Sequence, residues 1–209
     1  MKTALFLLFS CSVVLGQMPP RQPVPEAIRI EAQKATQALM NQVVKGDFEA
    51  GFKHMNPEWK KIEARKNGGL AKLNSKIRRT VADLQAKGIT LRATQAKMPV
   101  TAYEVDFGTN EQVLNGVKQN IGVYKQWMVF VPTVSQVTAV DKGATPPEIV
   151  EMLLYGFQIA LCKKGTNDWT FIDGAHIKGA ELRQLFPFLP ADEKDLAFPK
   201  RGGQVINKR

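Results

Sequence analysis

The sequence predicts an α+β protein whose N-terminal helices pack on one face of a curved, mostly antiparallel sheet of about five strands. Two observations lead to this prediction. Up to residue 88, apolar residues recur every three or four positions, which is the period of a helix, and beyond it they alternate, which is the period of a strand. Helices that precede strands along a chain typically gather on one side of an antiparallel sheet. The expected single domain covers residues 26–190.

The first sixteen residues predict a secretory signal. Met1-Lys2-Thr3 gives the basic start, and the apolar run at residues 4–15 has the length of a signal core and is short for a membrane span. We expect cleavage after Gly16; the alternative is a lipoprotein acylated at Cys11. Cleavage after Gly16 leaves Cys162 as the only cysteine, so the fold has no internal disulfide. The expected location is exported, periplasmic or extracellular, in a bacterium.

The helical region follows a proline-rich linker at residues 17–25. The first helix is expected to start at Pro25 and to end at Lys45-Gly46, a basic last turn followed by a C′ glycine. Its apolar positions are Ile28, Ala32, Ala35, Leu39 and Val43. Asp47 and Asn56 are N-cap residues that predict two shorter helices after it.

The clearest amphipathic helix is predicted between residue 70 and Lys87-Gly88. Its apolar stripe consists of Leu70, Leu73, Ile77, Val81 and Leu84. We expect this stripe to lie across the sheet. The other face and the preceding segment carry a cluster of cations, which is a candidate anion-binding surface. The cluster comprises Lys60, Lys61, Arg65, Lys66, Lys72, Lys76, Arg78 and Arg79. The ordinary interpretation is a solvated helix face, and the absence of interleaved aromatic residues argues against nucleic acid.

Strands are predicted from residue 89 onward. Residues 89–93 and 100–107 form the first two, with a bulge expected between Ala102 and Tyr103, where the apolar phase slips. A loop or hairpin connection at residues 108–120 leads to a third, central strand at residues 122–131.

A hairpin at residues 152–174 is expected to complete the sheet. Its first strand alternates large apolar residues with small or polar ones, and residues 163–167 form a polar turn. The large residues are Leu153, Tyr155, Phe157, Ile159 and Leu161. Residues 177–189 hold at most one short helix, and residues 191–209 are expected to be a mobile basic tail.

This order of elements resembles the NTF2-like (cystatin-like cone) superfamily over residues 26–175. The resemblance lies in the long first helix, the stretch Lys45-Gly46-Asp47-Phe48-Glu49-Ala50, the stripe from Leu70 to Leu84, and the closing Asp168-Trp169-Thr170-Phe171-Ile172-Asp173. It implies a pocket enclosed by the helices and the concave sheet. A small apolar ligand in that cone, or a protein partner on the sheet, follows as an expectation, as does a homodimer.

Few residues are candidates for chemistry. His54 and His176 lack metal-ligand spacing, so we expect neither a metal nor a cofactor. Asp173 and His176 form the one candidate acid–base pair, although an aspartate at a strand end more often caps a turn. The candidate ligand-binding residues at a pocket mouth are Tyr124, Trp127 and Tyr155. Aromatic residues on central strands, however, usually belong to the core.

Three functions follow as hypotheses. The first is an exported, non-enzymatic protein that binds a small ligand or a protein partner. The second is a small lyase, isomerase or hydrolase with a buried acid–base group. The third is an envelope-associated protein that binds an anionic polymer or lipid, which the net charge of +10 favours. A deep pocket with an ionisable floor would indicate the enzyme, and a closed apolar cone an interaction role.

Overall fold

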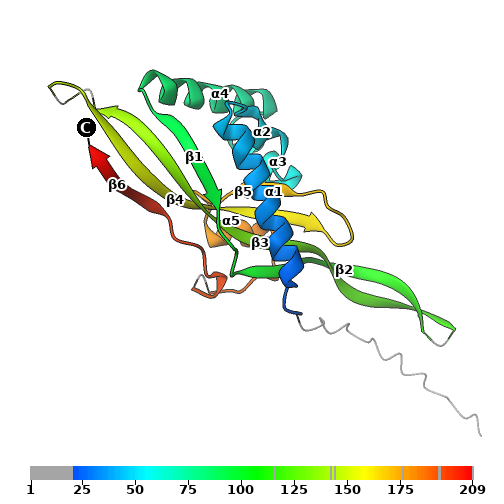
Figure 1. Ribbon diagram of the computed structural model, residues 1–209. Coiled ribbons are helices and arrows are strands. Elements are labelled where there is room, and N and C mark those ends of the chain that lie inside the picture. Colours follow the sequence, from blue (N-terminus) through cyan, green and yellow to red (C-terminus); the bar gives the residue numbers. More distant parts are fainter. Residues whose placement is uncertain are drawn as a thin grey trace, which may run out of the picture.

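A computed structural model describes residues 21–114, 116–141, 143, 145–175, 177–192 and 194–208 (Figure 1). Four helices precede a six-stranded antiparallel sheet, so the predicted α+β class is confirmed. The helices are α1 (Glu26–Val44), α2 (Glu49–Lys53), α3 (Pro57–Lys66), α4 (Leu70–Ala86) and α5 (Gly179–Leu185), with a 3-10 turn η1 (Lys194–Leu196). The predicted signal segment, with Cys11, and His176 lie outside the described residues.

Two long strands form the middle of the sheet. The strands are β1 (Thr90–Ala96), β2 (Ala102–Leu114), β3 (Val117–Asp141), β4 (Glu148–Lys163), β5 (Thr170–Asp173) and β6 (Gly202–Lys208). β3 and β4 pair along sixteen residues of each. β1 and β2 both pair with the outer edge of β3, whereas β5 and β6 pair with the outer edge of β4.

The β2–β3 hairpin departs from the sequence prediction in two ways. Residues 108–120 belong mostly to the two strands, which pair as far as Leu114 and Val117. The pairing is continuous across Ala102 and Tyr103, so the predicted bulge at that point is wrong. The irregular residue is Asp106, which has a positive φ of 60° within β2. Aspartate tolerates this conformation better than most residues.

Helix α1 lies across one face of the sheet (Figure 1). Small residues dominate this contact, because Ala32 of α1 and Ala160 and Cys162 of β4 are buried in the same cluster. Their small volume lets the helix approach the strands closely. The side chains of Gln33 and Gln37 donate hydrogen bonds to backbone oxygens of β1, and Gln37 accepts one from the Ala96 N–H, at distances of 2.8–2.9 Å.

The opposite face of the sheet is covered by α5 and the C-terminal segment. Large side chains fill this side, with Phe130 and Phe157 fully buried and Phe198 stacked on Phe157 at a centroid distance of 5.5 Å. Gly174 belongs to the same contact, because a Cβ built there would lie 2.4 Å from the Phe157 ring. The large residues of the predicted β4 alternation therefore point to this face.

The C-terminal tail is ordered, contrary to the expectation of a mobile segment. Gly202–Lys208 forms β6, which pairs with Val150–Tyr155 of β4. Leu196 is fully buried, and the Arg201 guanidinium donates a hydrogen bond to the Ile177 carbonyl oxygen at 2.9 Å. The prolines before it end helical structure, but β4 offers a free edge to which the chain returns.

The end of the expected linker is also held against the sheet. The Gln22 N–H donates a hydrogen bond of 2.9 Å to the buried Glu104 carboxylate, and Val24 is buried. Lys164 forms an ion pair with the same carboxylate.

Helix α4 lies at the periphery, mainly against α3 (Figure 1). Of its predicted stripe, Leu73 is 5% exposed, but Leu70 is 53% and Leu84 is 42% exposed. The helix forms where the pattern predicts it, yet the stripe does not lie across the sheet as expected, because α1 occupies that position.

Candidate functional site: a groove beside α1

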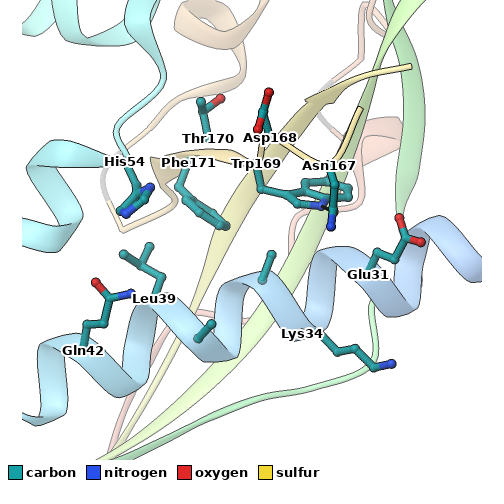
Figure 2. A pocket seen from close by; sticks show the side chains of 12 residues that line it. Glu31, Lys34, Leu39, Gln42, His54, Asn167, Asp168, Trp169, Thr170 and Phe171 are labelled. Carbon is teal, nitrogen blue, oxygen red and sulfur yellow. Dashed lines mark hydrogen bonds between the residues drawn. The ribbon is translucent and has the colours of Figure 1, made fainter. Parts of the chain in front are cut away.

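An open groove of about 650 Å³ lies between α1 and the segment that leads into β5 (Figure 2). We call it the α1 groove. Its lining residues are Glu31, Lys34, Ala35, Ala38, Leu39, Gln42, His54, Asn167, Asp168, Trp169, Thr170 and Phe171. Both faces of the sheet are filled by packed side chains, so this groove lies outside the cone that the family resemblance implies.

Helix α1 forms one wall of the α1 groove. Its six lining residues, from Glu31 to Gln42, fall at positions i, i+3, i+4, i+7, i+8 and i+11, which places them along one side of the helix. The small side chains of Ala35 and Ala38 leave space beside this part of the helix. Leu39 lies between the groove and the core, with 4% of its surface exposed. The middle of this wall, at Ala35, Ala38 and Leu39, is therefore apolar.

Two aromatic residues form the opposite wall. Trp169 and Phe171 are largely buried, and the Trp169 indole N–H is satisfied by the Asn167 side-chain oxygen at 2.9 Å. The Phe171 N–H donates to the His54 carbonyl oxygen at 2.9 Å, and the Asn56 N–H donates to the Phe171 carbonyl oxygen at 2.8 Å. These two bonds fix the wall to the loop between α2 and α3.

Polar groups lie at the two ends of the α1 groove. The His54 ring is at one end, near Phe171 and Leu39, while Glu31 and Asn167 are at the other (Figure 2). The histidine and the carboxylate of Glu31 are thus separated by the apolar centre and do not form an acid–base pair. Within the described residues, no group of three or more His, Cys, Asp or Glu side chains could hold a metal ion.

Asp173 lies outside the α1 groove. Its carboxylate accepts a hydrogen bond from the Ala175 N–H at 3.1 Å and one from the Gln158 side chain at 3.4 Å, as a turn-capping aspartate does. It lines a second groove, of about 580 Å³, between α3, α4 and α5. Because His176 is outside the described residues, its pairing with Asp173 stays a prediction.

The three predicted aromatic residues do not meet in one pocket. Tyr124 is buried against the Phe107 ring at a centroid distance of 5.4 Å. Trp127 lies three residues along β3 and so points to the other face, where the Lys164 ammonium is 4.2 Å from its ring centroid. Tyr155 is covered by Lys200 at 4.7 Å.

Five of the eight residues of the predicted basic cluster have partners within the protein. Lys61 pairs with Glu58, Lys66 with Glu63 and Glu181, and Arg78 with Glu49, at N–O distances between 2.5 and 2.9 Å. Lys60 lies 4.7 Å from the Phe52 ring centroid, and Lys76 donates to the Asn67 side chain. The exposed Arg65, Lys72 and Arg79 have no ion pair within the part of the chain that the structure describes.

Sequence reasoning missed the α1 groove. It considered His54 for metal binding alone. Trp169 and Phe171 belong to a buried cluster and line the groove as well. The sequence does contain one indication of the groove. Ala35 and Ala38 are small residues next to the buried positions of α1, and they leave space on that side of the helix.

Comparisons of this chain with protein-family models, with curated proteins and with solved structures find no match. The resemblance to the NTF2-like superfamily therefore stays a prediction. Among the described residues, no helix combines the length and the apolar character that a membrane crossing requires.

Proposed function

We propose that this protein is a non-enzymatic binding protein that holds a small ligand with an apolar or aromatic body in the α1 groove. One observation carries the proposal: the apolar surface of Leu39, Trp169 and Phe171 lines an open cavity, although both faces of the sheet are filled. Apolar side chains beside an open cavity are typical of ligand sites.

The size and polarity of the α1 groove support this class of ligand. Its volume of about 650 Å³ lies within the range of roughly 300–1,000 Å³ that is usual for small-molecule sites. The centre suits a ring or a short aliphatic chain, and the His54 and Glu31 ends suit polar substituents that fix its orientation. The enzyme hypothesis has less support, because His54 and Glu31 lie at opposite ends of the groove and form no acid–base pair (Figure 2).

A neutral fluorescent probe tests the proposal without interference from the net charge. We expect N-phenyl-1-naphthylamine to bind the full chain with enhanced emission. Ala38→Phe should abolish this signal because the ring fills the α1 groove, while Ala71→Phe, at an exposed position of α4, should leave it intact. Circular dichroism confirms that both variants fold. Unchanged probe binding in Ala38→Phe contradicts the proposal.

A further inference from the structure

The end of the β2–β3 hairpin extends beyond the rest of the sheet (Figure 1). We call this part of the two strands, residues 107–124, the β2–β3 arm. β4 pairs with β3 only as far as Gln126 and Lys163, so among the described residues no strand covers the edge of β3 at 118–124 that faces away from β2. Two strands alone form a marginally stable ribbon in water, and an open edge offers unpaired backbone groups to a further strand.

The backbone groups along this free edge of β3 are aligned for pairing. The Lys125 carbonyl oxygen points to the β4 side, because it accepts a hydrogen bond from the Lys164 N–H at 2.9 Å. In an antiparallel ladder, every second residue turns its N–H and C=O groups to the same side. Those of Gln119, Ile121 and Val123 therefore face away from β2, along the line in which β4 would continue.

The β2–β3 arm carries no net charge, although the whole chain has a net charge of +10. Its two charged residues, Glu111 and Lys118, form an ion pair across the hairpin at 2.8 Å. At the base of the arm, the Lys125 side chain extends over β2, where a Cβ built at Gly108 would lie 2.6 Å from its Nζ. Both lysines are thus turned toward β2, so a second copy of this basic protein can approach the free edge without placing like charges opposite each other.

The other edge strands of the sheet are less open to a further strand. On β1, the side chains of Gln33 and Gln37 occupy backbone groups at the outer edge. On β5, the loop between α2 and α3 bonds to both backbone groups of Phe171. On β6, Lys200 and Lys208 flank the strand, and lysines at an edge discourage another chain from pairing. Within the described residues, the arm is therefore the part of the sheet best suited to accept a strand.

We propose that two copies of this chain pair through the free edge of β3 in the β2–β3 arm, antiparallel and about a two-fold axis at Ile121. Ile121 is the middle one of the three outward-facing residues, so this register places it opposite its own copy and places Gln119 opposite Val123. Each such pair exchanges two backbone hydrogen bonds. Ile121 and Val123 are half-buried and β-branched, and such side chains pack well across neighbouring strands. The inference is independent of the ligand proposed for the α1 groove.

Proline substitutions on the two edges of the β2–β3 arm test the pairing. Sedimentation equilibrium of the full chain should show a dimer that dissociates on dilution. Ile121→Pro should weaken the dimer at least about tenfold, because it removes the N–H of the central pair in both copies and no hydrogen bond to β2. The matched control is Asn110→Pro, since Asn110 lies directly opposite Ile121 in the hairpin and turns its N–H to the outer edge of β2. It should change the dissociation constant by less than about twofold.

A disulfide at the two-fold axis tests the register. Ile121→Cys should form a covalent dimer with oxidised glutathione, because the Cα atoms of such a pair lie about 5.5 Å apart, within the reach of a disulfide. Asn110→Cys is the control and should stay uncrosslinked, with both variants made in a Cys11→Ser chain.

Three results would overturn the proposal. The first is a chain that stays monomeric up to its solubility limit. The second is a dimer that Ile121→Pro leaves unchanged, or that Asn110→Pro weakens as much as Ile121→Pro does. The third is a covalent dimer that forms as readily through Asn110→Cys as through Ile121→Cys, because the pairing would then not be specific to the free edge of β3.

Discussion

Helices α1 and α4 are of similar length, but the protein uses them in opposite ways. The stripe of α4 is the more regular amphipathic pattern, yet Leu73 is its one buried residue. The pattern of α1 is weaker and includes Thr36, yet Ala32 and Thr36 are completely buried and Leu39 nearly so. Periodicity therefore indicated that both helices form, but it did not rank how deeply each is buried.

The surface that each helix meets explains the difference. α1 meets small side chains on β4 and hydrogen-bonding groups on β1, so it can approach the sheet closely. α4 meets α3 and two open grooves, which leaves both ends of its stripe exposed. Shape complementarity with the partner thus decides burial, and a strong stripe without a fitting partner remains half exposed.

Truncating a leucine in each helix gives the largest contrast. Leu39→Ala should lower the free energy of unfolding by about 2–5 kcal/mol, because it leaves a cavity beneath α1. Leu84→Ala, at the exposed end of α4, should change it by less than about 0.5 kcal/mol. Urea denaturation of both variants measures the difference, and similar losses would show that α4 is packed as firmly as α1.

Asn56 tests how firmly the helical region is joined to β5. Its side-chain oxygen accepts hydrogen bonds from the N–H groups of Glu58 and Trp59, and its amide donates to Thr170 at 3.2 Å. Asn56→Ala should therefore cost about 1–2 kcal/mol of unfolding free energy. Asn74→Ala within α4 is the matched control and should cost nothing in thermal denaturation. If Asn56→Ala leaves the unfolding free energy unchanged, the cap does not stabilise α3.

Thr36 gives an effect in the opposite direction. Its hydroxyl is completely buried under α1, and among the described residues it has no hydrogen-bond partner. Thr36→Val keeps the shape and removes the unsatisfied hydroxyl, so we expect stability to rise by about 1 kcal/mol. Differential scanning calorimetry measures this gain. A loss of stability of the same size would show that the Thr36 hydroxyl has a hydrogen-bond partner in solution, such as a water molecule between α1 and the sheet.

The smallest effect concerns the ion pair between α3 and α5. The hydrogen bond from Lys66, followed by that from the Lys178 backbone, lowers the pKa of Glu181 below its ordinary value. This carboxylate contributes stability above its ordinary pKa, and the contribution is lost as the pH falls through the lowered value. Glu181→Gln should cost less than about 1 kcal/mol at neutral pH, since the pair is partly exposed. The loss of unfolding free energy should vanish in acid and become smaller in high salt, which urea denaturation at several pH values measures. A loss that persists in acid would contradict a stabilising ion pair between Lys66 and Glu181.

Local signals in the sequence predicted the class of fold and most of its helical boundaries. Lys45-Gly46 ends α1, with Gly46 at a positive φ of 95°, and Asn56-Pro57 starts α3. The closing hairpin was found as well, because its alternation reflects a sheet that buries large residues on one face. Such signals act over a few residues and survive in any tertiary context.

What depended on distant contacts could not be predicted. β6 exists because β4 leaves an edge free more than forty residues earlier in the chain. The α1 groove joins Glu31 to Asn167, which no local pattern connects. The length of the β2–β3 hairpin is an exception, because the Asn115-Gly116 dipeptide is a strong local turn signal in the sequence.

Native-state hydrogen exchange tests the central claim, that α1 is fixed on the sheet while α4 is a loosely held outer helix. Amides in the middle of α1 should exchange only through opening that approaches global unfolding. Those in the middle of α4 should exchange through local opening at a free energy at least about 2 kcal/mol lower. Equal protection of the two helices would contradict the account.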